Sequence, residues 1–296
     1  MSLALAAGRL LCPVCRSALD LWSPSGHRID RPEPVPVERA ACAQGHSFDP
    51  AASGYLNLSG RAAPANADSP AMVRARHRFL ASGAYDRLAQ AVADHLTQAL
   101  AEPPDPAAAD RPVRALAEAG VGTGHYLQRC LEAQTAPTLA LAWDVSPAAA
   151  RQAARNHPGM ALLVADTWRP LPLRPAQFDG LLCLFAPRHL LQFADLLAPG
   201  GVLLLGLPEP DHLASLRRRL NLIGLRPDKL NRLLAQLPDR LTVVDSSRLA
   251  YDLAASPEQV SDLVMMGPNA FHGAVAAAPA AELEVRVRLL TLRRTS

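Results

Sequence analysis

The sequence predicts an α/β protein with a doubly wound parallel sheet, preceded by a small metal-binding module. From residue 113 onward, short apolar runs alternate with helical stretches at the spacing of βαβ units. Before that region, three cysteines and a histidine stand in two closely spaced pairs. A chain of 296 residues is long enough for one α/β domain and a small accessory module.

Each expected element follows from local patterning. Apolar positions at helical spacing predict helix from about 70 to 101, and a Pro/Ala/Asp-rich linker follows at 102–112. The expected strands of the sheet are 114–119, 138–143, 161–164, 178–184 and 202–207. The expected helices between them are 124–134, 147–156 and 189–197. A strand at 240–253, a helix at 257–266 and a strand at 283–292 end the chain, and we expect the last two strands to form a hairpin at the sheet edge.

The net charge of +3 does not by itself predict a nucleic-acid partner. Lys229 is the single lysine, and the other basic residues are arginines, which a GC-rich genome largely explains. Their clustering is more informative, because arginine binds phosphate and stacks on bases. The two clusters that predict RNA contact, each also compatible with a solvated helix face, are Arg74, Arg76 and Arg78, and Arg217, Arg218, Arg219, Arg226, Lys229 and Arg232.

Five cysteines, an odd number with three near the N-terminus, argue against a disulfide framework. The sequence has neither an apolar run long enough to cross a bilayer nor a signal-peptide cleavage pattern. We therefore expect a cytoplasmic protein without a membrane partner. The sequence does not fix the oligomeric state and is compatible with a homodimer.

The two N-terminal pairs have the spacing of a zinc site. Cys12-Pro-Val-Cys15 and Cys42-Ala-Gln-Gly-His46 supply three thiolates and one imidazole, the closed tetrahedral set typical of structural zinc. His27 lies between the pairs and is a weaker candidate than His46. The alternative, free cysteines in a loop-rich segment, leaves four correctly spaced donors unexplained.

A glycine loop, Glu118-Ala-Gly-Val-Gly-Thr-Gly124, directly follows the first strand of the sheet. Glycines at a strand–helix junction let the backbone approach a ligand closely, so Gly120, Gly122 and Gly124 are expected to bind a cofactor. Asp144, after the second strand, is placed to accept hydrogen bonds from ribose hydroxyls, and Asp166, after the third, to contact an adenine edge.

Dinucleotide-binding domains use a similar loop, but an NAD site explains Asp166 and the turn Pro199-Gly-Gly201 poorly. We expect Gly200 and Gly201 only to shape that turn.

Residues 118–207 resemble a class I S-adenosylmethionine methyltransferase, and nearly the whole chain resembles the RlmA family of 23S rRNA (guanine-N1)-methyltransferases. Zinc pairs and a methyltransferase domain in this order are distinctive. The motifs that carry the wider resemblance are Leu11-Cys-Pro-Val-Cys15, Cys42-x3-His46-Ser-Phe-Asp49, Gly54-Tyr-Leu-Asn-Leu58, Asp68-Ser69, Met72, Ala75-Arg76, Phe79-Leu80, Gly83-Ala-Tyr85 and Pro208-x3-His212-Leu213.

The resemblance implies three parts: a zinc-binding RNA-recognition module (1–58), a helical connector and linker (59–112) and an S-adenosylmethionine-dependent methyltransferase domain (113–296). It implies zinc on Cys12, Cys15, Cys42 and His46, and the methyl donor near Tyr85, Gly122, Thr123, Asp144 and His212. It also implies a hairpin of 23S rRNA near the macrolide-binding exit tunnel as the substrate. The segment 266–272 favours the RlmA-II, tylosin-resistance-like form, and with it macrolide resistance.

Two departures from the family pattern are visible. The segment between the two pairs of zinc ligands is longer than is usual in the family and is rich in proline. Val121 stands at a position where a cysteine is common in the family. The first puts the RNA-facing surface of the zinc module in doubt, whereas the second is expected to have no consequence.

Guanine N1 carries a proton, which the enzyme must remove or hold in another tautomer. The candidate catalytic residues are His212, with a cofactor-lining role as the first expectation and proton transfer as the second, and His189. Two other functions stay open: a methyltransferase acting on a small molecule, and a non-catalytic RNA-binding protein that keeps a cofactor site.

Overall fold

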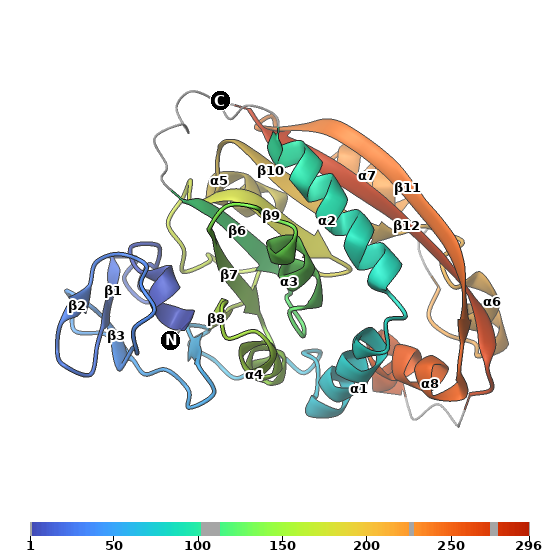
Figure 1. Ribbon diagram of the computed structural model, residues 1–296, viewed down its shortest axis with the longest axis horizontal. Helices are drawn as coiled ribbons and strands as arrows, with labels where there is room; N and C mark the ends of the chain where they lie inside the picture. Colours follow the sequence, from blue (N-terminus) through green and yellow to red (C-terminus); the bar gives the residue numbers. More distant parts are fainter. Residues whose placement is uncertain (1, 102–112, 225–227, 273–277, 296) are drawn as a thin grey trace.

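The computed structural model describes residues 2–101, 113–224, 228–272 and 278–295. In these residues a four-stranded sheet has the order β2-β1-β3-β4, and an eight-stranded sheet has the order β11-β12-β10-β9-β6-β7-β8-β5 (Figure 1). The small sheet belongs to the N-terminal module and the large sheet to the rest of the chain.

The centre of the large sheet is parallel. Its strands are β6 (Arg114–Ala119), β7 (Thr138–Asp144), β8 (Ala161–Val164), β9 (Phe178–Leu184) and β10 (Leu197–Pro208). They are almost continuously buried, as parallel strands covered on both faces must be. The chain order runs from β6 to β8 in one direction and from β9 to β10 in the other, so the topological switch point lies between β6 and β9. The predicted doubly wound sheet is confirmed.

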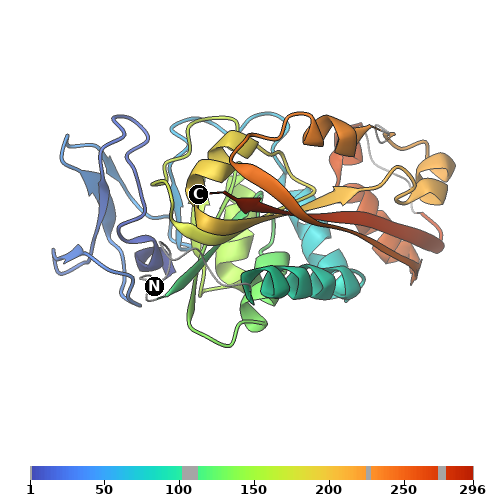
Figure 2. The ribbon, with the colours of Figure 1, turned by 90° about the horizontal axis from the view of Figure 1, so that it is seen from above.

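Helices cover both faces of this sheet. One face packs against α2 (Asp86–Ala101), α3 (His125–Glu132) and α4 (Pro147–Asn156), and the other against α5 (Leu190–Leu196) and α7 (Lys229–Leu234). Figure 2 shows α2 on one side of the sheet and α5 on the opposite side. The parallel strands therefore have an apolar core on each face.

The helical stretch predicted for residues 70–101 is two helices. Its first part, α1 (Pro70–Ala81), is capped by the Ser69 hydroxyl, which accepts a hydrogen bond from Met72 N. The break falls at Gly83, whose φ of 79° lies in the left-handed region favoured by glycine, and α2 begins after it. A continuous apolar spacing on both sides of the break conceals this turn in the sequence.

The N-terminal module contains η1 (Ser2–Ala6), β1 (Leu19–Trp22), β2 (Arg28–Ile29), β3 (Arg39–Cys42) and β4 (Ser47–Phe48). The next strand, β5 (Tyr55–Asn57), pairs in parallel with β8 and so already belongs to the large sheet. The division at residue 58 stays a prediction, and the linker proposed at 102–112 lies outside the described residues.

The C-terminal strands form one edge of the large sheet. β11 (Leu241–Ala255) and β12 (Ala281–Arg294) are antiparallel neighbours, and β12 also pairs with β10, which confirms the predicted edge hairpin. Three further helical elements lie in this region: α6 (Ala214–Arg219), α8 (Pro257–Met265) and η3 (Pro268–His272). Within the described residues, no helix is both long enough and apolar enough to span a bilayer.

The turn expected at Pro199-Gly-Gly201 is a strand irregularity. β10 starts at Leu197, and its pairing with β9 shifts register between Leu197 and Val202, with Gly200 at a φ of 74°. A Cβ on Gly201 would lie 2.9 Å from the Ala198 carbonyl oxygen, so close backbone packing favours glycine there.

Candidate active site and zinc site

A cavity of about 550 Å³ opens at the carboxyl ends of β6, β7 and β9, beside the switch point. Ligands of doubly wound sheets bind at this position, and the volume suits a nucleoside-sized molecule. The predicted cofactor residues that line the cavity are Tyr85, Gly120, Gly122, Thr123, Asp144, Asp166 and His212. Gly124 is not among the lining residues and instead forms the N-cap of α3.

The glycine loop is held against the end of β7. Gly120 N donates to the Trp143 carbonyl oxygen at 2.9 Å. Gly120 has a φ of 70°, and a Cβ there would lie 2.4 Å from Ala186 Cβ. At Gly124, a Cβ would lie 2.4 Å from the His157 ring. Left-handed backbone and close contacts therefore both require glycine in this loop.

The Asp144 carboxylate holds the glycine loop through a hydrogen bond. Its Oδ2 accepts from Gly122 N at 3.0 Å and its Oδ1 from Ser146 N at 2.9 Å. Burial raises the pKa of Asp144, while the hydrogen bonds from Ser146 and Gly122 oppose the rise. A carboxylate has about four acceptor positions, so two remain for ribose hydroxyls.

Glu118 is a buried acid beneath the same loop. Its side chain accepts a hydrogen bond from Leu127 N at 3.1 Å, and burial raises its pKa well above the ordinary value. Glu118 lines the cavity, although the sequence identified it only as the start of the loop. An acid two residues before the first glycine is the signal that could have identified it.

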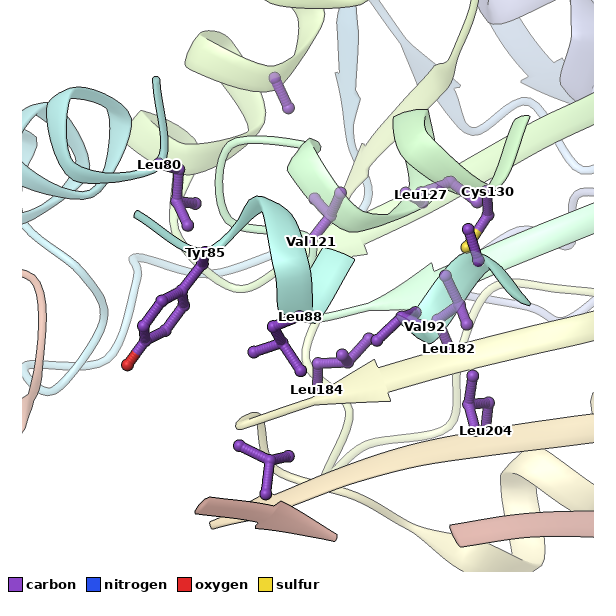
Figure 3. Close-up of a cluster of buried hydrophobic side chains, with 14 of the residues drawn as sticks. Leu80, Tyr85, Leu88, Val92, Val121, Leu127, Cys130, Leu182, Leu184 and Leu204 are labelled. Atoms are coloured by element: carbon purple, nitrogen blue, oxygen red, sulfur yellow. The ribbon is translucent and has the colours of Figure 1, made fainter. Parts of the chain in front are cut away.

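Tyr85 comes from the turn between α1 and α2. Its ring packs edge-on against Phe79, with ring centroids 4.9 Å apart. Figure 3 shows the Tyr85 hydroxyl directed away from Leu88 and the rest of the buried cluster. Tyr85 thus combines a core position with a place in the cavity wall.

The segment after β8 carries Asp166 and Trp168. The Asp166 carboxylate accepts from Trp168 N at 2.9 Å, and the Trp168 side chain is 63% exposed at the cavity. The same segment then contacts the zinc module: Leu11 N donates to the Pro172 carbonyl oxygen at 2.9 Å, and Arg16 Nη1 donates to the Leu171 carbonyl oxygen at 2.7 Å. One short segment therefore links the cavity rim to the N-terminal module.

His212 is buried and its tautomer is fixed. Its Nδ1 accepts from Arg286 N at 3.1 Å, which leaves the proton on Nε2. Burial lowers the pKa of His212 to about 4, so the ring is neutral at pH 7. Its ring stacks with Phe185 at a centroid distance of 6.1 Å. A neutral ring with a protonated Nε2 donates a hydrogen bond, which argues for a ligand-holding role rather than a general base.

We expect this histidine to make stability depend on pH. Its pKa is about 4 when folded and about 6.5 when exposed, so its contribution is complete above pH 6.5 and is lost as the pH falls toward 4. The loss amounts to about 3 kcal/mol. Denaturant unfolding of the wild type and of His212→Asn between pH 4 and 7 checks this: the variant should show the smaller loss. Equal pH dependence in both proteins would contradict it.

His189 lies outside the cavity lining. It is the N-cap of α5, where its Nδ1 accepts a hydrogen bond from Gln192 N at 3.3 Å. Its ring lies 6.3 Å from that of Trp168. The structure does not bring this histidine together with the other predicted site residues.

His125 is a cavity residue that the sequence did not single out. It follows the glycine loop at the start of α3, and its Nε2 is buried without a hydrogen-bond partner among the described residues. Burial lowers the pKa of His125, so the neutral ring has a polar atom free for a ligand. The rest of the wall includes Asn66, Asp68, Arg76, Met266 and Asn269.

The zinc donors meet in the N-terminal module. The donor atoms of Cys12, Cys15, Cys42 and His46 all lie within 4.8 Å of one another, and none of the cysteines forms a disulfide. Cys15 Sγ lies 3.7 Å from Cys42 Sγ, and His46 Nδ1 lies 3.6 Å from Cys12 Sγ and 3.4 Å from Cys42 Sγ. Tetrahedral zinc places two sulfurs about 3.8 Å apart and sulfur and nitrogen about 3.5 Å apart. The four donors fit a structural zinc ion.

The predicted RNA-binding residues have different surroundings. Arg76 lies in the cavity wall, pairs with Asp68 and donates to the Met266 carbonyl oxygen at 2.7 Å. Arg78 pairs with Asp262, and Arg217 donates to the Pro210 carbonyl oxygen. Arg74, Arg218 and Arg219 are exposed, Lys229 is half-buried, and Arg226 lies outside the described residues. Their contact with RNA stays a prediction.

Two relatives cover most of the chain. A protein of Micromonospora griseorubida named as a 23S rRNA (guanine-N1)-methyltransferase is 36% identical over 89% of this chain and 87% of its own length. The 23S rRNA (guanine(748)-N1)-methyltransferase of Streptomyces fradiae is 38% identical over 78% of this chain and 79% of its own length.

The comparisons with family models and with solved structures do not help to identify the family. No family model matches the chain. Among solved structures, a methyltransferase in complex with its Haloferax volcanii activator is 18% identical, with a TM-score of 0.47 over 77% of this chain and 99% of that chain; at this score the likeness carries no weight. The identities over most of both relatives, together with the fold, cavity and zinc donors, show that the chain belongs to the family of 23S rRNA (guanine-N1)-methyltransferases.

Proposed function

We propose that this protein transfers a methyl group from S-adenosylmethionine to N1 of a guanine in a hairpin of 23S rRNA near the macrolide-binding exit tunnel. The observation that carries the proposal is a nucleoside-sized cavity, built on a glycine loop and Asp144, in a chain of this family. The relative whose name specifies guanine 748 leads us to propose the corresponding guanine as the target.

Different residues of the cavity would bind and orient the methyl donor. The donor, when bound, supplies an electrophilic methyl group on a sulfonium. The close backbone approach that the glycines allow and the free acceptor positions of Asp144 would hold its nucleoside, with Asp166 and Tyr85 on the cavity wall. Because a neutral thioether leaves as the bond from N1 to the methyl carbon forms, and the N1 proton passes to water, orientation supplies most of the acceleration.

The guanine would enter the same cavity from the rim. Phe185 lines the cavity, is 40% exposed and adopts a φ of 56°, which is uncommon for a residue other than glycine. His212 Nε2–H would donate to an oxygen of the bound ligands. A base in a hairpin loop can be splayed out and stacked on such an aromatic ring.

Incubation with unmodified 23S rRNA and methyl-labelled donor tests the proposal. We expect one labelled guanine and a stop of reverse transcription at that position, because a methyl group on N1 blocks base pairing. Label entering small molecules but never RNA would favour a small-molecule methyltransferase instead. Donor binding without any transfer would favour a non-catalytic RNA-binding protein.

A cytoplasmic location and a homodimer stay predictions. The first agrees with an rRNA substrate.

A further inference from the structure

Exposed apolar side chains gather at the opening of the cavity. Of the large apolar residues that the structure exposes, Trp168, Phe185 and Ile223 line the cavity, and they come from three separate segments. Trp168 is the most exposed of them, at 63%. The other two tryptophans of the chain differ, because Trp143 is fully buried and Trp22 is half-buried. An indole left in solvent at the edge of a ligand cavity indicates a surface that a ligand covers.

The backbone around Trp168 is fixed, although its ring is open to solvent. Trp168 N donates to Asp166 Oδ1 at 2.9 Å. The preceding residue is held twice: the Thr167 carbonyl oxygen accepts from Gln192 Nε2 at 3.0 Å, and Thr167 Oγ1 accepts from Trp143 Nε1 at 3.1 Å. An aromatic ring on a backbone held in this way needs little ordering when it binds a flat partner.

The surroundings of the indole suit a nucleic acid. The imidazole of His189 lies 6.3 Å from it between ring centroids and is tilted by 58°, so the two rings do not stack face to face. The next residue, Arg169, is exposed. Further along the segment, the exposed Arg16 of the zinc module donates to the Leu171 carbonyl oxygen at 2.7 Å. Aromatic rings flanked by arginines bind the bases and phosphates of single-stranded RNA.

We propose that Trp168 stacks on a base of the RNA next to the target guanine. The inference rests on the proposed function, because it takes RNA as the substrate. The guanine would occupy the cavity, whereas Trp168 stands at its edge on the segment that leads to the zinc module. Figure 1 shows this module beside β8, the strand that precedes Trp168. A nucleotide adjoining the guanine would cross this edge, and stacking would hold it there whatever its base.

The test compares Trp168→Ala and Trp168→Phe with the wild type in binding to a 23S rRNA transcript. Loss of a stacked base should weaken the binding of Trp168→Ala about 5- to 150-fold, and Trp168→Phe should recover most of the affinity. The slope of log affinity against log salt should not change, because no charge is removed. The melting temperature and the affinity for S-adenosylmethionine should also stay at the wild-type values, since the ring is largely exposed.

The fluorescence of the indole gives a second measurement that a merely structural role would not affect. A base stacked on Trp168 quenches its emission, so adding the transcript should lower the fluorescence of the wild type. The Trp168→Phe variant keeps Trp22 and Trp143 and should lack this part of the change. S-adenosylmethionine alone should leave the emission of Trp168 unchanged.

Leu191→Ala is the matched control. Leu191 is 60% exposed on α5 and lies outside the cavity lining. The inference is rejected if Trp168→Ala binds RNA as tightly as this control, or if Trp168→Phe is as weak as Trp168→Ala. It is also rejected if Trp168→Ala loses donor affinity, because the ring would then stack on the adenine of the donor. Wild-type protein that neither binds nor methylates the transcript would refute the proposed function, whereas unchanged variants beside an active wild type would refute this inference alone.

Discussion

Asp144→Ala is expected to abolish the binding of S-adenosylmethionine. The change removes the acceptor positions proposed for the ribose and also the hydrogen bonds from Gly122 N and Ser146 N that hold the glycine loop in place. Two hydrogen bonds to a charged group contribute about 3 to 6 kcal/mol, which corresponds to a loss of about 10²- to 10⁴-fold in affinity. Isothermal titration calorimetry measures it directly.

The zinc content of Asp144→Ala should equal that of the wild type, because the zinc donors lie in the N-terminal module. Asp94→Ala is a suitable control, since Asp94 is an exposed acid on α2 whose side chain accepts a hydrogen bond from Gln90 and lies outside the cavity lining. Unchanged donor affinity in Asp144→Ala would remove Asp144 from the site.

Cys12→Ser is expected to lose the zinc ion and, with it, the fold of the N-terminal module. The strands of this module are only two to four residues long, and structural zinc contributes on the order of 10 kcal/mol to the folding of such segments. RNA binding and methylation should therefore fall to background. Metal analysis and RNA binding of the purified variant measure both effects.

The donor site should largely survive the same substitution. Asp144 and the glycine loop depend on β6 and β7, so donor affinity should fall far less than in Asp144→Ala. Hydrogen exchange should increase at Leu11 and Arg174, because their backbone N–H groups lose the acceptors Pro172 O and Arg9 O, respectively. Cys130→Ser, which changes a buried thiol of α3, should keep its zinc. Stoichiometric zinc in Cys12→Ser would contradict the ligand assignment.

The parts of the site that are formed by residues close together in the sequence could be predicted from it. The central strands are continuous apolar runs, and the glycine loop and Asp144 each stand directly at a strand end, so strand order alone brings them together. The zinc donors are two short pairs whose spacing is itself the signal. These features follow from neighbouring residues and were predictable.

The remaining cavity wall depends on contacts between distant residues. Arg76 illustrates the difficulty: on a helix with Arg74 and Arg78 it resembles a phosphate-binding residue, but its partners are Asp68 and the carbonyl of Met266, 190 residues away. Similarly, the tautomer of His212 is set by the backbone of Arg286 in β12. Such pairings arise only when the edge hairpin and α8 pack against α1 and β10, and no local pattern encodes them.

A crystal structure of the protein with S-adenosylmethionine is the decisive measurement. We expect the donor in the cavity, with its ribose hydroxyls on Asp144, its adenine beside Asp166 and its methyl group facing the opening at Phe185. A donor bound elsewhere, or a cavity closed by the protein's own side chains at saturating donor, would contradict it.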